Sequence, residues 1–189
     1  MRNVLVVLNC SKRKSIDLGL VYSRIGKVPG FDIENESIYR QVLSDLMRPA
    51  IDMYDGPEFR ILRKFRWCID LFVFSARYGI INGERPIIPY DAYLKDVDYS
   101  VIDKWAKYGN WDLNKLIGNT WDIAIIRLSH KYMEYFMKVV RNPCTLGRRI
   151  HIITGKHNNK LACKNEIPHY VRGPGQSQSA LLHLLTENC

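Results

Sequence analysis

Short, largely apolar segments recur along the chain, and each has the length of a buried strand. The first, residues 4–8, is a continuous apolar run that leads directly into Asn9 and a triply basic loop ending at Lys14. Continuous runs of this kind suit strands buried on both faces of a parallel sheet. The pattern predicts four such strands, at residues 4–8, 69–74, 121–126 and 149–154.

Helical periodicity occupies most of the intervals between these segments. Ser37 is a candidate N-cap for a helix that begins at Ile38, and further helices are expected near residues 102–117, 132–140 and 180–185. The long stretch 9–36 indicates either a loop that folds over a ligand or a surface excursion with a helical turn of its own. Strands that alternate with helices predict an α/β fold: a three-layer, mostly parallel sheet flanked by helices, in a single domain spanning residues 1–189.

Polar and mostly basic residues follow each predicted strand. These groups are Ser11 to Lys14, Ser75 to Tyr78, Ser129 to Lys131 and Gly155 to His157. If the strands are parallel, all four loops lie at one edge of the sheet, where open α/β sheets bind their ligands. The alternative is that polar turns simply end such strands, but four together favour a shared cleft for an anionic ligand.

The residue types in these loops suggest how such a ligand would be held. The candidate phosphate-binding residues are Ser11, Lys12, Lys14, Ser75, Arg77 and Lys156. Arg77 could bind phosphate in bidentate fashion. Tyr78 and Tyr90 would frame a base or sugar, with Tyr78 able to stack on a base.

A glycine-rich segment precedes the last predicted helix. Gly173 and Gly175 would let backbone N–H groups face an anion at the helix N-terminus, and the amide of Gln176 suits a base edge or a ribose. The segment matches neither the Walker A pattern nor Gly-x-Gly-x-x-Gly. Ordinary helix capping is the alternative explanation.

Few side chains in these motifs suit catalysis. The candidate general acids or bases are Asp91, which follows an extended proline-bounded segment, His130 and Glu84, with Asp91 preferred; Ser11 is a candidate nucleophile. The basic neighbours of Cys10 would favour a thiolate, but no histidine or acid adjoins it in sequence. Because the sequence contains no histidine pair at i, i+4 and no acidic cluster in the motifs, we predict no metal and no cofactor.

The composition narrows the class of protein. Hydrophobic residues make up 47% and charged residues 25% of the 189 residues, as in globular proteins. No apolar run approaches the ~20 residues of a membrane helix, and the N-terminal run is too short for a signal peptide. We therefore expect a cytoplasmic protein without a membrane partner, of undetermined oligomeric state. The five cysteines are irregularly spaced and predict neither a disulfide framework nor a zinc site.

The net charge of +9 favours contact with polyanions, either nucleic acid or phosphorylated ligands. Residues 59–67 interleave aromatic side chains with four basic ones and form a second candidate surface for nucleic acid. A solvated helix face is the more common explanation of such a stretch.

Four motifs in this order resemble those of a known family. They are Asn9-Cys-Ser-Lys-Arg-Lys14, Ser75-Ala-Arg-Tyr-Gly-Ile-Ile81, Pro89-Tyr-Asp91 and Gly173 to Gln176. Small uncharacterised domains of bacteria, archaea and phages carry similar Ser-Cys-Ser-Lys, Ser-Ala-Lys-Tyr-Gly-Leu, Pro-Tyr-Asp and Gly-x-Gly-x-Gln motifs, and they look related to the YaaA-type peroxide-stress proteins. This chain departs from them at Asn9, at Arg77 and at the proline between Gly173 and Gly175. The resemblance implies a role with nucleotides or nucleic acid, in DNA or RNA modification or in stress protection.

Two functions follow as hypotheses. The first is an enzyme, a hydrolase or transferase acting on a nucleotide or nucleobase in the basic strand-end cleft. The second is a non-catalytic DNA- or RNA-binding protein that uses the same basic edge. A third possibility is a scaffold whose motifs only stabilise strand-end turns.

Overall fold

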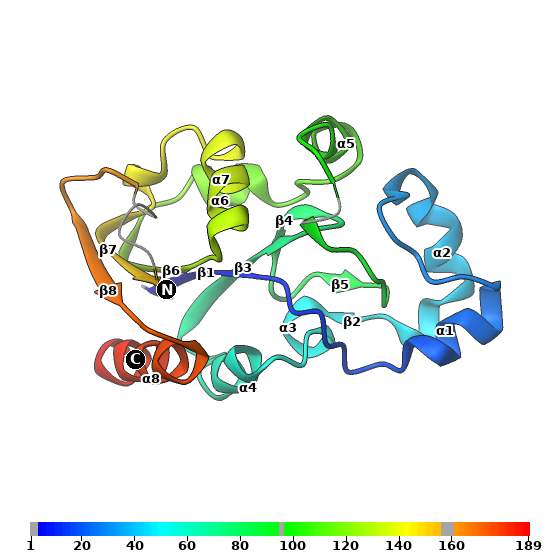
Figure 1. Cartoon of the computed structure of the whole chain (residues 1–189), viewed down its shortest axis with the longest axis horizontal. Helices are drawn as coiled ribbons and strands as arrows, with labels where there is room; N and C mark the ends of the chain where they lie inside the picture. Colours follow the sequence, from blue (N-terminus) through cyan, green and yellow to red (C-terminus); the bar gives the residue numbers. More distant parts are fainter. Residues whose placement is uncertain (1–3, 95–96, 156–160) are drawn as a thin grey trace.

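The computed structural model describes residues 4–94, 97–155 and 161–189, and its centre is a six-stranded sheet (Figure 1). The spatial order is β4 (Gly79–Asn82), β3 (Ile69–Ser75), β1 (Val4–Asn9), β6 (Trp121–Arg127), β7 (Gly147–Thr154) and β8 (Glu166–Tyr170). All neighbouring strands pair in parallel except β3 and β4, which form an antiparallel hairpin. The predicted α/β class and the mostly parallel sheet are confirmed.

Helices and short turns occupy the connections. They are α1 (Leu18–Ile25), η1 (Ile33–Asn35), α2 (Glu36–Val42), η2 (Ser44–Leu46), α3 (Ala50–Met53), α4 (Pro57–Lys64), α5 (Val101–Tyr108), α6 (Leu113–Ile117), α7 (His130–Val139), η4 (Pro143–Thr145) and α8 (Pro174–Asn188). The strands β2 (Arg48–Pro49) and β5 (Pro86–Ile87) pair with each other in a separate, two-stranded antiparallel sheet. Figure 1 shows α6 and α7 on one side of the strands and α4 and α8 on the other. Among the described residues, no helix combines the length and apolar character needed to cross a membrane.

The apolar run of β1 lies at the centre of the core. Residues 4–8 are at most 3% exposed, because β3 and β6 flank the strand in the sheet and side chains cover both of its faces. Full burial on both faces explains why this strand is continuously apolar rather than alternating.

Several elements differ from the sequence-based expectation. α2 begins at Glu36 after Asn35, so Ser37 lies inside the helix and does not cap it. β8 was not expected, because Pro168 interrupts its pattern; none of its residues is fully buried. Proline is tolerated on a strand at the edge of a sheet, where one side of the backbone has no partner strand. The stretch 9–36 contains a full helix, α1, which Asp17 caps by accepting a hydrogen bond from the Gly19 backbone N–H (2.9 Å) and which ends at Gly26 in the left-handed region.

The Ser75–Gly79 segment is the tight turn of the β3–β4 hairpin. The Oγ of Ser75 accepts hydrogen bonds from the backbone N–H groups of Arg77 (3.2 Å) and Tyr78 (3.1 Å). Gly79 has a φ of 69°, and a Cβ there would lie 2.1 Å from Oδ1 of Asn110. Both facts require glycine at the position that closes the turn.

Arg77 is the largest charged side chain in the core. Its Nη2 lies 3.0 Å from Oε2 of Glu36, its Nη1 lies 3.1 Å from Oδ1 of Asp32, and Nη1 also donates to the Gly30 carbonyl. Burial acts to lower the pKa of Arg77, but Tyr78 and the two acids outweigh it and the pKa is raised. The fully charged guanidinium therefore fixes residues 30–36 against the hairpin turn.

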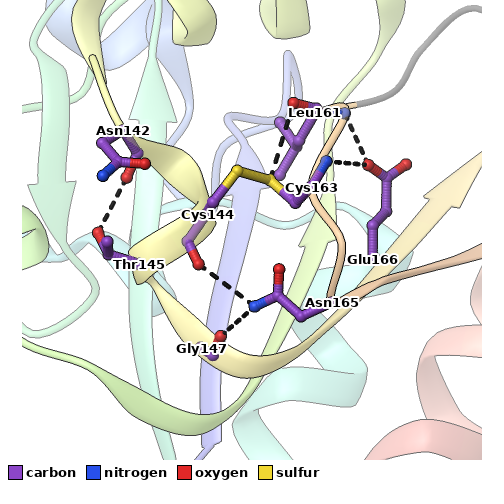
Figure 2. The surroundings of a disulfide bond; sticks show 8 residues. All are labelled: Asn142, Cys144, Thr145, Gly147, Leu161, Cys163, Asn165 and Glu166. Carbon is purple, nitrogen blue, oxygen red and sulfur yellow. Dashed lines mark hydrogen bonds between the residues drawn. A yellow bond between two sulfur atoms is a disulfide. The ribbon is translucent and has the colours of Figure 1, made fainter.

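Two disulfides correct the expectation of unpaired cysteines. Cys68 bonds to Cys189, and Cys144 bonds to Cys163; Cys10 is free and buried. The first bridge joins the segment before β3 to the C-terminal end of α8. Figure 2 shows the second, in which the amide of Asn165 donates to the carbonyls of Cys144 and Gly147. The partners are 121 and 19 residues apart, so spacing alone did not reveal either pair.

Replacing Arg77 tests its structural role. We expect Arg77→Ala to lower the free energy of unfolding by about 3 kcal/mol, the lower end of the usual cost of breaking a buried ion pair. The buried carboxylate of Glu36 would lose the Arg77 guanidinium and keep only that of Arg40, whose Nε lies 2.9 Å from Oε1. The matched control is Arg24→Ala, which removes a surface ion pair with Asp45 and should leave the free energy of unfolding nearly unchanged. Urea denaturation of the oxidised protein measures both. An equal loss of unfolding free energy in the two variants would contradict the structural role of Arg77.

The two disulfides should differ in their contribution to stability. The chain-entropy relation gives about 5 kcal/mol for the loop closed by Cys68–Cys189 and about 3 kcal/mol for the loop closed by Cys144–Cys163. The comparison requires the double variants Cys68→Ser/Cys189→Ser and Cys144→Ser/Cys163→Ser, with free energies of unfolding taken from urea titrations. The reverse ranking would show that native-state contacts around η4, not loop length, set the difference.

Candidate ligand cleft at the carboxyl edge

The carboxyl ends of the parallel strands form one edge, and the strand order places a switch point in it. β3 lies on one side of β1, whereas β6, β7 and β8 follow on the other side. In open α/β sheets the crevice at such a point, outside the strand ends, is where ligands bind. Here it lies between the ends of β1 and β6. The side chain of Asn9 bridges it by accepting a hydrogen bond from the Ser129 backbone N–H (3.1 Å).

Two pockets open along this edge. The larger pocket has a volume of about 500 Å³ and lies at the ends of β6, β7 and β8 beside the start of α8; its polar lining includes Arg127, Ser129, His130, Thr154 and Arg172. The smaller pocket, of about 250 Å³, lies at the end of β1 beside the start of α4; its polar lining includes Asn9, Cys10, Ser11, Lys12, Glu58 and Arg127. Arg127 lines both pockets, so the two form one composite cleft.

Arg127 is held in place from two helices. Its Nε donates to Oγ of Ser177 on α8 (2.9 Å), and its Nη2 lies 3.8 Å from Oε1 of Glu58 on α4. Ser177 is buried, and the Arg127 side chain is 23% exposed, enough to reach a ligand. Sequence reasoning missed this residue, although the signal was present: Arg127 directly follows an apolar strand at its carboxyl end.

The basic loop after β1, residues 11–14, is held by internal hydrogen bonds, and part of it lines the smaller pocket. Nζ of Lys14 donates to the backbone carbonyls of Ser11 (2.8 Å) and Lys12 (3.1 Å), and it lies 4.6 Å from the centre of the Tyr90 ring. Burial lowers the pKa of Lys14, against the opposing effects of Cys10 and Asp91. Lys14 therefore shapes the loop, whereas Ser11 and the exposed Lys12 face the pocket.

Four of the predicted binding residues are buried and line neither pocket. Ser75, Arg77, Tyr78 and Tyr90 are at most 1% exposed. The Tyr90 hydroxyl is 2.7 Å from Oγ of Ser75 and 2.8 Å from the Tyr54 hydroxyl, and the Tyr78 hydroxyl donates to Glu36. Burial raises the pKa of Tyr78 and of Tyr90, so both remain protonated. Their polar atoms are engaged within the protein, and the predicted contacts of these side chains with phosphate or base have no support in this arrangement.

Of the remaining predicted site residues that the structure describes, only Gly173 is among the residues that line either pocket. Gly173 lines the larger pocket, and Gly175 is exposed in the first turn of α8. Oε1 of Gln176 accepts a hydrogen bond from the Arg172 backbone N–H (2.7 Å), which orders the entry to that helix. Asp91 is exposed and lines neither pocket, although its charge acts on Lys14. Lys156 lies outside the described residues.

Cys10 lies at the base of the smaller pocket. Its Sγ is 3.1 Å from the Tyr132 hydroxyl and accepts a long hydrogen bond from the Ala76 backbone N–H (3.5 Å). Burial raises the pKa of Tyr132, so this hydroxyl also stays protonated. The thiol is therefore held by neutral partners instead of a histidine or an acid.

The fold and the cleft define an α/β protein with a basic, two-part pocket at the carboxyl edge of its sheet. A family model of unknown function, DUF6884, matches residues 43–152, and the chain belongs to this family. The matched part contains Glu58 and Arg127 but neither the Ser11 loop nor α8. No curated protein and no solved structure matches the chain.

The close approach of the first loop to α4 gives a test of the smaller pocket. A Cβ at Gly56 would lie 2.9 Å from Oγ and 3.1 Å from Cβ of Ser11, so Gly56→Ala should displace the loop and cost about 1–3 kcal/mol in the free energy of unfolding. Gly175→Ala is the matched control, because nothing lies within 4 Å of the place its methyl group would take and alanine favours the helix. Chemical denaturation measures both. An unchanged Gly56→Ala variant would show that the loop is not pressed against α4.

Proposed function

We propose that this protein binds a nucleotide, or a nucleotide unit of a nucleic acid, in the composite cleft and acts on it as a hydrolase or transferase. The proposal rests on the position of Arg127. Its guanidinium is partly exposed at the switch point, and the residue lines both pockets. Arginine suits phosphate because its donors are fixed in a planar fork. A role in DNA or RNA modification or in stress protection, as the YaaA-type resemblance implies, is consistent with such a ligand.

The charge of the larger pocket supports an anionic ligand. Arg127 and Arg172 contribute cations, and no acidic side chain is present among the described residues that line it. The start of α8 lies at the same pocket, where the helix dipole adds positive potential. We also take the domain as a three-layer arrangement, supported by helices on both sides of the strands in Figure 1, since a switch point requires connections on opposite faces.

The second candidate function, non-catalytic binding of DNA or RNA, is supported by the net charge of +9. The basic stretch 59–67 contributes little to it. Arg60 and Arg63 pair with Asp55, and Arg66 pairs with Asp52 and Glu84. Because these three guanidinium groups already have carboxylate partners within the protein, the cleft is a better site for a phosphate than this helix face.

Substitution of Arg127 tests the proposal. Arg127→Gln should weaken binding of nucleoside monophosphates about tenfold, the value of one lost charge-assisted hydrogen bond. The matched control is Arg148→Gln, an exposed arginine near the amino end of β7, at the opposite edge of the sheet. Isothermal titration calorimetry gives the affinities, and thermal melting confirms that both variants are folded.

The outcomes separate the two functions. If the wild-type protein binds neither nucleotides nor single-stranded DNA or RNA, both proposals fail. If it binds only the polymers, with a slope of about −0.7 in log K against log[salt] for each phosphate contacted and no effect of Arg127→Gln, the extended binding surface is correct and the nucleotide cleft is wrong.

A further inference from the structure

Unlike the larger pocket, the smaller one has an acidic side chain in its described lining, beside the cations Lys12 and Arg127. Glu58, in the first turn of α4, is the one acidic side chain among the described residues that line it, and its side chain is 18% exposed. It is positioned by Arg127, whose Nη2 lies 3.8 Å away. The acid therefore stands at the junction of the pockets, on the side of the smaller one.

The carboxylate of Glu58 makes the two pockets suited to different chemical groups. An ionised carboxylate accepts hydrogen bonds and donates none, so it repels a phosphate group and attracts hydroxyl groups. The larger pocket offers cations with no acid in its described lining. Lys12 and Arg127 also line the smaller pocket, but only the larger pocket has cations with no acid beside them in its described lining. A ligand with an anionic end and a hydroxyl-bearing part would therefore bind preferentially with its anion in the larger pocket.

The remaining groups of the smaller pocket are consistent with a polyhydroxyl ligand. Ser11 and Asn9 add short polar side chains at the end of β1, and Cys10 with Phe59 gives the pocket an apolar base. Lys12 is exposed at the rim. The volume of about 250 Å³, half that of the larger pocket, suits a sugar ring better than a sugar with its base and phosphate.

We propose that the smaller pocket binds the ribose of a nucleotide, that Glu58 accepts hydrogen bonds from its 2′- and 3′-hydroxyl groups, and that the phosphate binds beside Arg127 in the larger pocket. The ligand class is thus a ribonucleotide, and Glu58 determines the preference for ribose. This inference rests on the proposed function, because it assigns the parts of a nucleotide to the two pockets. It is the same chemistry by which acidic residues bind ribose hydroxyls at the switch point of dinucleotide-binding sheets.

The experiment compares ligands that differ only in these hydroxyl groups. The four ribonucleoside 5′-monophosphates are each titrated against their 2′,3′-dideoxy counterparts by calorimetry. The wild-type protein should bind the preferred ribonucleotide about tenfold more tightly than its dideoxy counterpart, as expected for hydrogen bonds to a charged acceptor. In Glu58→Ala this ratio should fall to about one, through a loss of ribonucleotide affinity and not of dideoxynucleotide affinity.

Two further variants make the test specific. Glu58→Gln keeps a neutral acceptor of the same shape and should retain an intermediate preference. Glu34→Ala removes an exposed acid that pairs with Lys104 and should leave the ratio unchanged. Thermal melting identifies any variant that does not fold, and Glu58→Gln then takes the place of Glu58→Ala.

The possible failures are distinguishable. If the wild-type protein binds ribonucleotides and dideoxynucleotides equally, the assignment of Glu58 is wrong while the proposed function stands. If the preference exists but survives in both Glu58 variants, ribose is recognised by other residues and the inference is again wrong. If no nucleotide binds, the proposed function and the inference fall together.

Discussion

The buried guanidinium of Arg77 is the interaction on which the rest of this structure depends. A charge removed from water must be paired, and here the partners come from residues 30–36, a segment far away in the sequence. The pairing holds residues 30–36, in the long connection after β1, against the β3–β4 turn. Glu36 also accepts a hydrogen bond from the Tyr78 hydroxyl, so one carboxylate serves both residues of the turn.

The same framework extends to the wall of the cleft. The Tyr78 ring packs edge-on against Tyr90 (5.4 Å between ring centres), and Tyr90 bonds to Ser75 and Tyr54. Lys14 lies above the Tyr90 ring and holds the Ser11 loop through backbone carbonyls. Ser75, Tyr78 and Tyr90, which the sequence first suggests as ligand-binding residues, are thus part of the buried framework. They help to position the loop that lines the smaller pocket.

The sequence predicts the scaffold better than the site. Continuous apolar runs identified β1, β3, β6 and β7, and their shared carboxyl edge followed from the rule for parallel strands. Ser11, Lys12 and Gly173, which the same reasoning named as ligand-binding residues, line the two pockets, and their binding role stays a prediction. That reasoning did not show that Arg77 is buried, because its acidic partner Glu36 is 41 residues away and nothing local indicates the pairing. The disulfides were not predicted for the same reason, because the two cysteines of each pair are distant in the sequence.

Arg127 and Glu58 were missed because their importance depends on strand order. On its own, Glu58 is an ordinary acid in the first turn of a helix, where it complements the dipole. It becomes part of a site only because β6 lies beside β1, which brings Arg127 next to the start of α4. Many of the protein's cations are paired with acids on its surface, so net charge alone does not locate a phosphate site. A cation that is held from two sides, partly exposed and set at a switch point is a better candidate for one, because its orientation is fixed before any ligand binds and little ordering entropy remains to be lost on binding.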